Sequence, residues 1–348
     1  MRDNNPPIKP QFPPSGRYRW HIACALAALC VVPVCGAPAD AKGAVTTFDP
    51  PGSTATFPQG INDSGAIAGF YNDSGGVAHG FVRAADGTIT AFDPVGSIAT
   101  SALGINAKGW TAGFYADSKK VAHGFVRSPG GKITAFDPRG STGTEACGIN
   151  KSGAVTGYYY DSKSDAHGFL RTGDGKIRTF DAPGSTLTIA AAINDAGSVT
   201  GYYIGNSGGH GFVRTSNGTF ATFDPAGSIF TESFAINKDG SVAGIWQDIS
   251  YVIHGFVRTA AGTILTFDPP QSSGTEPRGI NATGRSVGFY TRAAGGPYGF
   301  VRSAGGKITE LNVGKATTTE ALAINGDGTV SGDYTDSAGV THGFVRAP

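Results

Sequence analysis

Four glutamates occupy one position of a repeated pattern in this chain, each five residues before an asparagine: Glu145, Glu232, Glu276 and Glu320. Carboxylates brought together bind cations, amines or sugar hydroxyls, and a pair of them can divide acid and base roles in catalysis. Arg278 adds a guanidinium two residues after Glu276, and Trp246 offers an aromatic surface for stacking. These six side chains form the candidate ligand site, for a sugar, a cation or a basic peptide end. The alternative interpretation is a solvated rim of structural polar residues.

Six histidines recur in the same pattern: His79, His123, His167, His210, His254 and His342. Each lies in its own repeat, too far from the next to share a metal ion, so we predict a structural hydrogen bond to a later aspartate, as from His123 to Asp137. The copy with Tyr298 fits this hypothesis, because Asn312 replaces its aspartate. Loop aspartates such as Asp117 are predicted to stabilise turns, since calcium needs about six or more oxygens. We therefore predict no metal site and no cofactor.

These residues belong to a pattern that is repeated seven times between Gly43 and the end of the chain. Its clearest motif is His-Gly-Phe-Val-Arg, which starts at His79 and recurs at intervals of 44, 44, 43, 44, 44 and 44 residues, with small variations. A constant period of about 20 to 50 residues is typical of arrays in which each unit buries its apolar face against its neighbours.

One repeat predicts four short β-strands, which in the second repeat are 101–106, 110–115, 123–127 and 132–137. Asn106 and Gly109 mark the first turn, because glycine adopts a positive φ and asparagine can bond its own backbone. Gly130-Gly131 is typical of a two-residue hairpin turn, and the register of such a turn sets Phe125 opposite Phe136. About ten residues without a strand pattern then lead to the next repeat, beginning near a proline that ends the sheet.

Four strands in about 44 residues, with no sustained helical period, predict an all-β fold, a seven-bladed β-propeller of four-stranded antiparallel blades. The seventh repeat stops where its fourth strand is due, and residues 45–49 carry the sequence of that strand. We predict that they pair with residues 342–346, which completes the last blade and closes the ring. An open β-solenoid is the alternative, but it would need distinct capping repeats.

The repeat resembles a known family of secreted bacterial proteins. Gly-Ile-Asn-x-x-Gly-x-x-x-Gly-x-Tyr-x-Asp followed by His-Gly-Phe-Val-Arg is similar to the HAF family of probable extracellular repeats, in which a His-Ala-Phe triplet occupies the place of His79-Gly80-Phe81. The resemblance covers nearly all of residues 43–348. It implies a secreted, propeller-like protein and carries over no catalytic residue.

The first 41 residues have a different composition. A basic, proline-rich segment precedes thirteen apolar residues, 22–34, and small residues at 37–41 offer a cleavage site. This order predicts a secretory signal peptide over 1–41, because thirteen apolar residues fall short of the roughly 20 that span a bilayer. One domain then covers 42–348, with no membrane span. Cys147 is its only cysteine, so an exported protein must be stable without an internal disulfide.

The charge balance of the chain and the motifs it lacks argue against several classes of function. The chain has 27 Lys and Arg against 26 Asp and Glu, a balance that argues against nucleic acid as a partner. No serine-nucleophile elbow, zinc-protease motif or phosphate loop is present, so we predict no enzyme. We expect a secreted monomer that binds or scaffolds a glycan or protein at the channel mouth. The alternatives are a carbohydrate-active glycosidase or lyase using acids such as Glu232 and Glu276, and a structural surface or matrix component.

Overall fold

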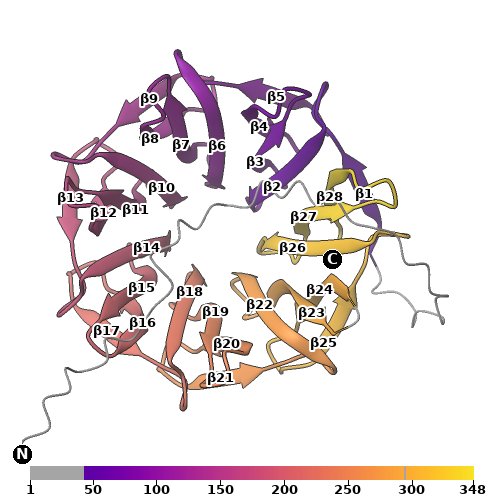
Figure 1. Ribbon diagram of the computed structural model, residues 1–348. Coiled ribbons are helices and arrows are strands. Elements are labelled where there is room, and N and C mark those ends of the chain that lie inside the picture. The colour runs from indigo at the N-terminus through magenta and orange to yellow at the C-terminus, as the bar shows by residue number, and fades with distance from the viewer. Residues whose placement is uncertain (1–42, 294) are drawn as a thin grey trace, which may run out of the picture. The chain divides into compact units, whose positions relative to one another are not determined.

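The computed structural model describes residues 43–293 and 295–348, and the predicted signal peptide lies outside them. Every regular element in this described part is a β-strand. Consecutive strands pair antiparallel in units of four, as the repeat predicts, and Figure 1 shows the first strand of each unit nearest the centre. None of the described residues forms a helix with the length and apolar character needed to cross a membrane.

The strands fall into four groups according to their place in a unit. The first strands are β2 (Ala55–Ile61), β6 (Ser97–Ile105), β10 (Gly143–Ile149), β14 (Leu187–Ile193), β18 (Phe230–Ile236), β22 (Ser272–Ile280) and β26 (Thr318–Ile324). The second strands are β3 (Ile67–Asn72), β7 (Thr111–Asp117), β11 (Val155–Tyr160), β15 (Val199–Gly205), β19 (Val242–Gln247), β23 (Ser286–Arg292) and β27 (Val330–Thr335). The third strands are β4 (Ala78–Arg83), β8 (Ala122–Arg127), β12 (Ala166–Arg171), β16 (Gly208–Arg214), β20 (Ile253–Arg258), β24 (Gly295–Arg302) and β28 (Thr341–Arg346). The fourth strands are β5 (Ile89–Phe92), β9 (Ile133–Phe136), β13 (Ile177–Phe180), β17 (Phe220–Phe223), β21 (Ile264–Phe267), β25 (Ile308–Leu311) and β1 (Val45–Phe48).

The prediction of four-stranded antiparallel blades is confirmed, with one difference at the connections. β6 begins at Ser97, four residues earlier than the predicted strand, and β10 begins at Gly143. The segment between blades is therefore shorter than the roughly ten residues that the missing alternation suggested. Burial does alternate along the start of these strands, but buried positions such as Thr100 and Thr144 hold threonine, so the sequence shows no alternation of apolar residues there.

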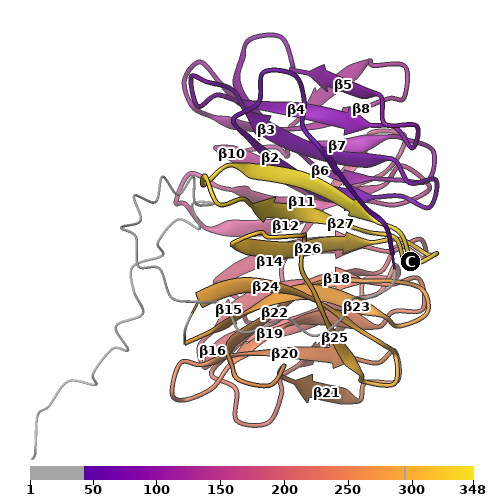
Figure 2. The same ribbon diagram turned by 90° about the vertical axis from the view of Figure 1, so that its right-hand side faces the viewer.

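β1 begins the described chain and lies beside β28, near its end. The register runs from Val45 opposite Arg346 to Phe48 opposite Gly343. Figure 2 shows the indigo start of the described chain next to the yellow β28. The pairing predicted for residues 45–49 is thus present over Val45–Phe48, and β28 also meets β2 at one parallel pair, Thr341 with Ala55.

The predicted register between third and fourth strands is wrong by one residue. Phe125 lies opposite Ala135, and Phe136 lies opposite Gly124. The hairpin has a three-residue loop closed between Ser128 and Lys132, with Gly131 at φ +88°, in place of the expected two-residue turn. A Cβ on Gly124 would lie 2.9 Å from the Phe136 ring, which explains why glycine stands at this position.

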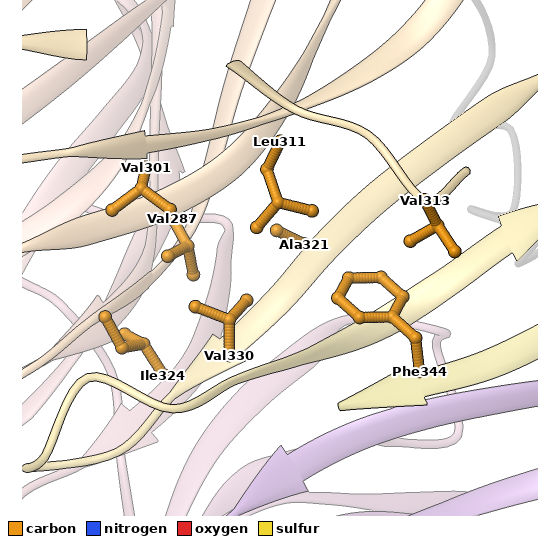
Figure 3. Close-up of a cluster of buried hydrophobic side chains, with 8 residues drawn as sticks. All are labelled: Val287, Val301, Leu311, Val313, Ala321, Ile324, Val330 and Phe344. Carbon is orange, nitrogen blue, oxygen red and sulfur yellow. The ribbon is translucent and has the colours of Figure 1, made fainter. Parts of the chain in front are cut away.

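The hydrophobic core lies between the faces of neighbouring blades. In Figure 3 Val287 and Leu311 of one blade meet Val330 and Phe344 of the next, and Phe344 has no exposed surface. The ring of Phe136 packs edge-on against Phe169 of the following blade, with 5.7 Å between centroids, so the aromatic pairs join blades instead of strands. Full burial of a phenylalanine, as of Phe169 and Phe344, contributes roughly 1.5–3 kcal/mol.

A chain of asparagines links the inner turns of successive repeats. Nδ2 of Asn106 donates to the backbone carbonyl of Asn150 at 2.9 Å, while its Oδ1 accepts the N–H groups of Lys108 and Trp110. The same donor bond joins the other repeats: Asn62 to Asn106, Asn150 to Asn194, Asn194 to Asn237, Asn237 to Asn281, Asn281 to Asn325 and Asn325 to Asn62. The predicted turn role of asparagine is confirmed, and the link to the next repeat is an addition to it.

Candidate functional site

The repeated glutamates lie on the first strands, each opposite a residue of the second strand. Glu145 faces Tyr158, Glu232 faces Ile245, Glu276 faces Phe289 and Glu320 faces Asp333. Side chains of directly opposite residues are neighbours in an antiparallel sheet. The surroundings of each glutamate are therefore set by the second strand of its own blade.

Glu320 and Asp333 form a facing pair of carboxyl groups. Asp333 is only 7% exposed. Burial raises the pKa of Asp333 well above its usual range, and the charge of Glu320 adds to the effect. Burial likewise raises the pKa of Glu320, with Arg278 working against the rise and Glu276 adding to it. Two carboxyl groups that face each other with little solvent around them resist double ionisation, which favours a proton shared by the pair or a cation beside it.

Asp333 was not among the predicted site residues, although the sequence contains a signal for it. It follows Gly332 at the place where the other repeats have an aromatic residue or isoleucine: Phe70, Phe114, Tyr158, Tyr202, Ile245 and Phe289. An acid at a position that is otherwise apolar is a departure that comparison of the repeats can detect.

Glu276 and Arg278 form an ion pair beside Glu320. Nη2 of Arg278 donates to Oε2 of Glu276 at 2.6 Å, and the guanidinium lies 4.4 Å from the ring centroid of Phe234 in the preceding blade. Both charged side chains are between one quarter and one third exposed. With Asp333 and Glu320, this cluster has three acidic groups and one guanidinium, and we call it the carboxylate cluster.

The other three predicted residues have different partners across their own blades. Glu145 accepts a hydrogen bond of 2.6 Å from the Tyr158 hydroxyl of its own blade, and burial raises its pKa despite that bond. Glu232 is 3% exposed and does not lie on a solvated rim. Trp246 pairs with Thr231 and stacks on His254 at 4.5 Å, so it lies on the sheet face opposite to that of Ile245 and Glu232. The structure thus brings Glu276, Arg278 and Glu320 together.

The histidines have a structural role, as predicted. Nδ1 of His123 lies 2.7 Å from Oδ2 of Asp137, and the corresponding bonds are present for His79, His167, His210, His254 and His342. Several of these aspartates also accept a hydroxyl bond from the next first strand, as Asp224 does from Thr231 at 2.7 Å. Each such couple therefore joins two neighbouring blades at their outer part.

The loop aspartates stabilise turns, again as predicted. Oδ1 of Asp117 accepts the backbone N–H groups of Lys119 and Val121 at 2.8 and 2.9 Å. In the described ranges, no three His, Cys, Asp or Glu side chains are grouped so that they could hold a metal ion.

Solved structures with the same architecture include both enzymes and other proteins. The β-propeller domain of the Trilobed protease from Pyrococcus furiosus matches with a TM-score of 0.61 at 10% sequence identity, over 84% of this chain and 95% of that one. An inactive virginiamycin B lyase from Staphylococcus aureus matches at 0.56 and 14% identity, over 88% and 100%. Puromycin hydrolase matches at 0.55 and 14%, over 82% and 51%. No family model and no curated protein matches the sequence.

These similarities establish a β-propeller fold for the described chain. At such low identity they carry no activity across, because one fold serves many functions.

Proposed function

We propose that the chain is an exported seven-bladed β-propeller, closed by β1, that acts as a non-catalytic binding module outside the cell. The closure is supported by the β1–β28 register and by the bond of 3.3 Å from Nδ2 of Asn325 to the carbonyl of Asn62. Contacts of β2 with both β6 and β26 support it as well. The signal peptide predicted over 1–41 and the resemblance to HAF repeats support export.

The ligand of the module is a group bearing a primary amine or a guanidinium, held at the carboxylate cluster. The observation that carries this proposal is the facing pair of Glu320 and Asp333 beside the ion pair of Glu276 and Arg278. Three acids, one of them buried and two partly buried, with one guanidinium leave a deficit of positive charge, which is unfavourable where solvent access is limited. A ligand cation corrects the deficit by taking the place of the shared proton.

Titration of the purified protein with lysine amide, arginine amide and spermidine tests the proposal. A cation that displaces a proton releases about one proton per site, which calorimetry detects as a dependence of the binding enthalpy on the buffer. We expect Glu320→Gln and Asp333→Asn each to weaken binding at least tenfold, whereas Glu145→Gln, a matched change in another blade, leaves it intact. Equal affinity in all three variants would remove the cluster from the ligand site.

One observation favours a second candidate, a carbohydrate-active enzyme. Glu276 is paired with an arginine, whereas burial keeps the pKa of Asp333 high, and two carboxyl groups in such different environments suit base and acid roles. A panel of polysaccharides incubated with the wild-type protein and with Asp333→Asn distinguishes the two. Turnover by the wild type alone would replace the binding proposal by a catalytic one.

Export is tested separately, by N-terminal sequencing of the protein recovered from the culture medium. We expect the mature chain to begin near residue 40. An intact N-terminus on protein retained inside the cell would contradict export, without affecting the ligand proposal.

A further inference from the structure

The sixth repeat departs from the others at four positions that meet in space. Its histidine is replaced by Tyr298 and the aspartate bonded to that histidine by Asn312. Arg292 stands where five of the other repeats have the loop aspartate, and Glu310 stands where every other repeat has alanine or threonine. In most repeats a histidine stands with a loop aspartate and a later aspartate. The sixth repeat replaces these three residues by side chains of different charge and size.

The four replacements form one connected group around Tyr290. Oε2 of Glu310 accepts bonds from Nη2 of Arg292 at 2.6 Å and from the Tyr290 hydroxyl at 2.5 Å, and its Oε1 accepts Nδ2 of Asn312 at 2.5 Å. The guanidinium lies 4.5 Å from the ring centroid of Tyr298. These contacts fix the planes of the arginine and the carboxylate, so the group is preorganised.

A pocket of about 310 Å³ opens beside this group, between the end of one blade and the outer part of the next. Its apolar lining comes from Pro269, Pro270 and Ile308, and its polar lining includes Gln271, Arg292 and Glu310. Arg292 and Glu310 are each about 30% exposed. The volume is at the lower end of the range of roughly 300–1,000 Å³ for small-molecule sites.

Hydrogen-bonding capacity remains on both charged side chains. Of the hydrogen bonds found among the described residues, none uses Nη1 of Arg292, and Oε1 of Glu310 accepts only Asn312. The pocket thus offers donors and acceptors side by side, which matches adjacent hydroxyl groups that each donate and accept. The charges of the pair cancel, so an ion of either sign gains little and meets one like charge.

We propose that this pocket is a second ligand site, for one neutral sugar residue held by Arg292 and Glu310 with its C–H face on the two prolines. The proposal is independent of the carboxylate cluster, because it rests on different residues and on a ligand without charge. A structural compensation for the lost histidine would explain the ion pair, but it would not require an open pocket or unused donors.

Ligand-observed NMR with the methyl glycosides of glucose, galactose, mannose and fucose tests it. We expect at least one to bind with a Kd on the order of 1 mM, since a single small site provides only about 4 kcal/mol. The decisive variant restores the common repeat through Arg292→Asp, Tyr298→His, Glu310→Thr and Asn312→Asp, and it should weaken that binding at least tenfold. Glu310→Gln, which keeps size and shape, should weaken it in the same direction if the fourfold variant fails to fold.

Two controls make the result specific. Thr266→Glu introduces the same carboxylate at the equivalent place in the preceding repeat and should leave sugar binding unchanged. Asp333→Asn should also leave it unchanged, which separates this site from the carboxylate cluster. Absence of a signal for all four glycosides, or undiminished binding in a folded fourfold variant, would overturn the proposal.

Discussion

Replacing Asn106 by aspartate removes one hydrogen-bond donor from the inner chain of asparagines and leaves the size of the side chain almost unchanged. Asn106 is 4% exposed, and its Nδ2 supplies the bond of 2.9 Å to the carbonyl of Asn150. A carboxylate can still accept the N–H groups of Lys108 and Trp110, but it cannot donate to Asn150. Its charge is placed beside a carbonyl oxygen that has lost its partner.

The expected loss of stability follows from these contacts. One lost hydrogen bond accounts for about 0.5–1.5 kcal/mol, and a buried carbonyl left without its donor adds about 1–3 kcal/mol. The aspartate accepts charge-assisted hydrogen bonds from the two backbone N–H groups, which offset part of this loss of stability. We therefore expect Asn106→Asp to lower the free energy of unfolding by about 2–4 kcal/mol.

Equilibrium unfolding in urea measures this difference at neutral pH and again at acidic pH. Because a protonated aspartic acid can donate to Asn150, the deficit of the variant should shrink as the pH falls toward about 4 and be smallest below it. Asn217→Asp is the matched control: Asn217 is exposed in a hairpin turn where Asp86 and Asp174 stand in other repeats, and the change should stay within about 0.5 kcal/mol. If Asn106→Asp costs no more than this control, the asparagine chain does not stabilise the fold as argued.

Three further predictions concern other parts of the framework. The pKa of Asp333 is raised in the folded protein, so this residue destabilises the fold as the pH rises above about 4. Asp333→Asn should therefore raise the unfolding midpoint at pH 7 and flatten the decline of that midpoint with pH. A midpoint of the variant below that of the wild type would contradict this. Burial acts to lower the pKa of His342, but the hydrogen bonds and charges of Asp49 and Asp336 together outweigh it and raise that pKa. The stabilising contribution of His342 is therefore full below about pH 6.5 and is lost as the pH rises through the folded value. His342→Asn should be most harmful at acidic pH, a trend that unfolding curves at several pH values can refute. Gly124→Ala should lower the free energy of unfolding by about 1–3 kcal/mol, because the added methyl group presses on the Phe136 ring. Phe136→Leu should recover part of this loss. A double-mutant cycle that shows no coupling between the two changes would disprove the contact as the cause.

The repeat period and the turn residues were sufficient to predict the strands, their antiparallel order and the bond of His123 to Asp137. They failed for the register of Phe125, because Gly131 permits both a two-residue turn and a three-residue loop with a bulge. A change of one residue in the loop moves every later pair by one. The choice between the two turns depends on packing against the next blade, where Phe136 meets Phe169.

Part of the candidate site was predictable from the sequence, and the rest was missed because it depends on which residues pair across strands. Counting along the first strand finds Glu276, Arg278 and Glu320, but it does not show which residue of the second strand faces each of them. That residue decides the chemistry: Tyr158 donates a hydrogen bond to Glu145, whereas Asp333 places a second acid against Glu320. Trp246 is an aromatic surface suited to stacking, but the alternation of a strand puts it on the face opposite to that of Ile245 and Glu232.

The departures in the sixth and seventh repeats differ in whether new contacts compensate for the loss of stability. In the sixth repeat the loss of a histidine and its aspartate is balanced by new bonds among Arg292, Glu310 and Asn312, so a charged group remains satisfied. In the seventh, Asp333 brings a buried acid next to Glu320, and the Arg278 guanidinium that acts on Glu320 is already paired to Glu276. An apolar residue there would preserve the fold at lower cost, as Phe289 does in the neighbouring blade. A departure that destabilises the fold in this way agrees with the proposed binding site, because a bound cation would offset the repulsion between the two acids.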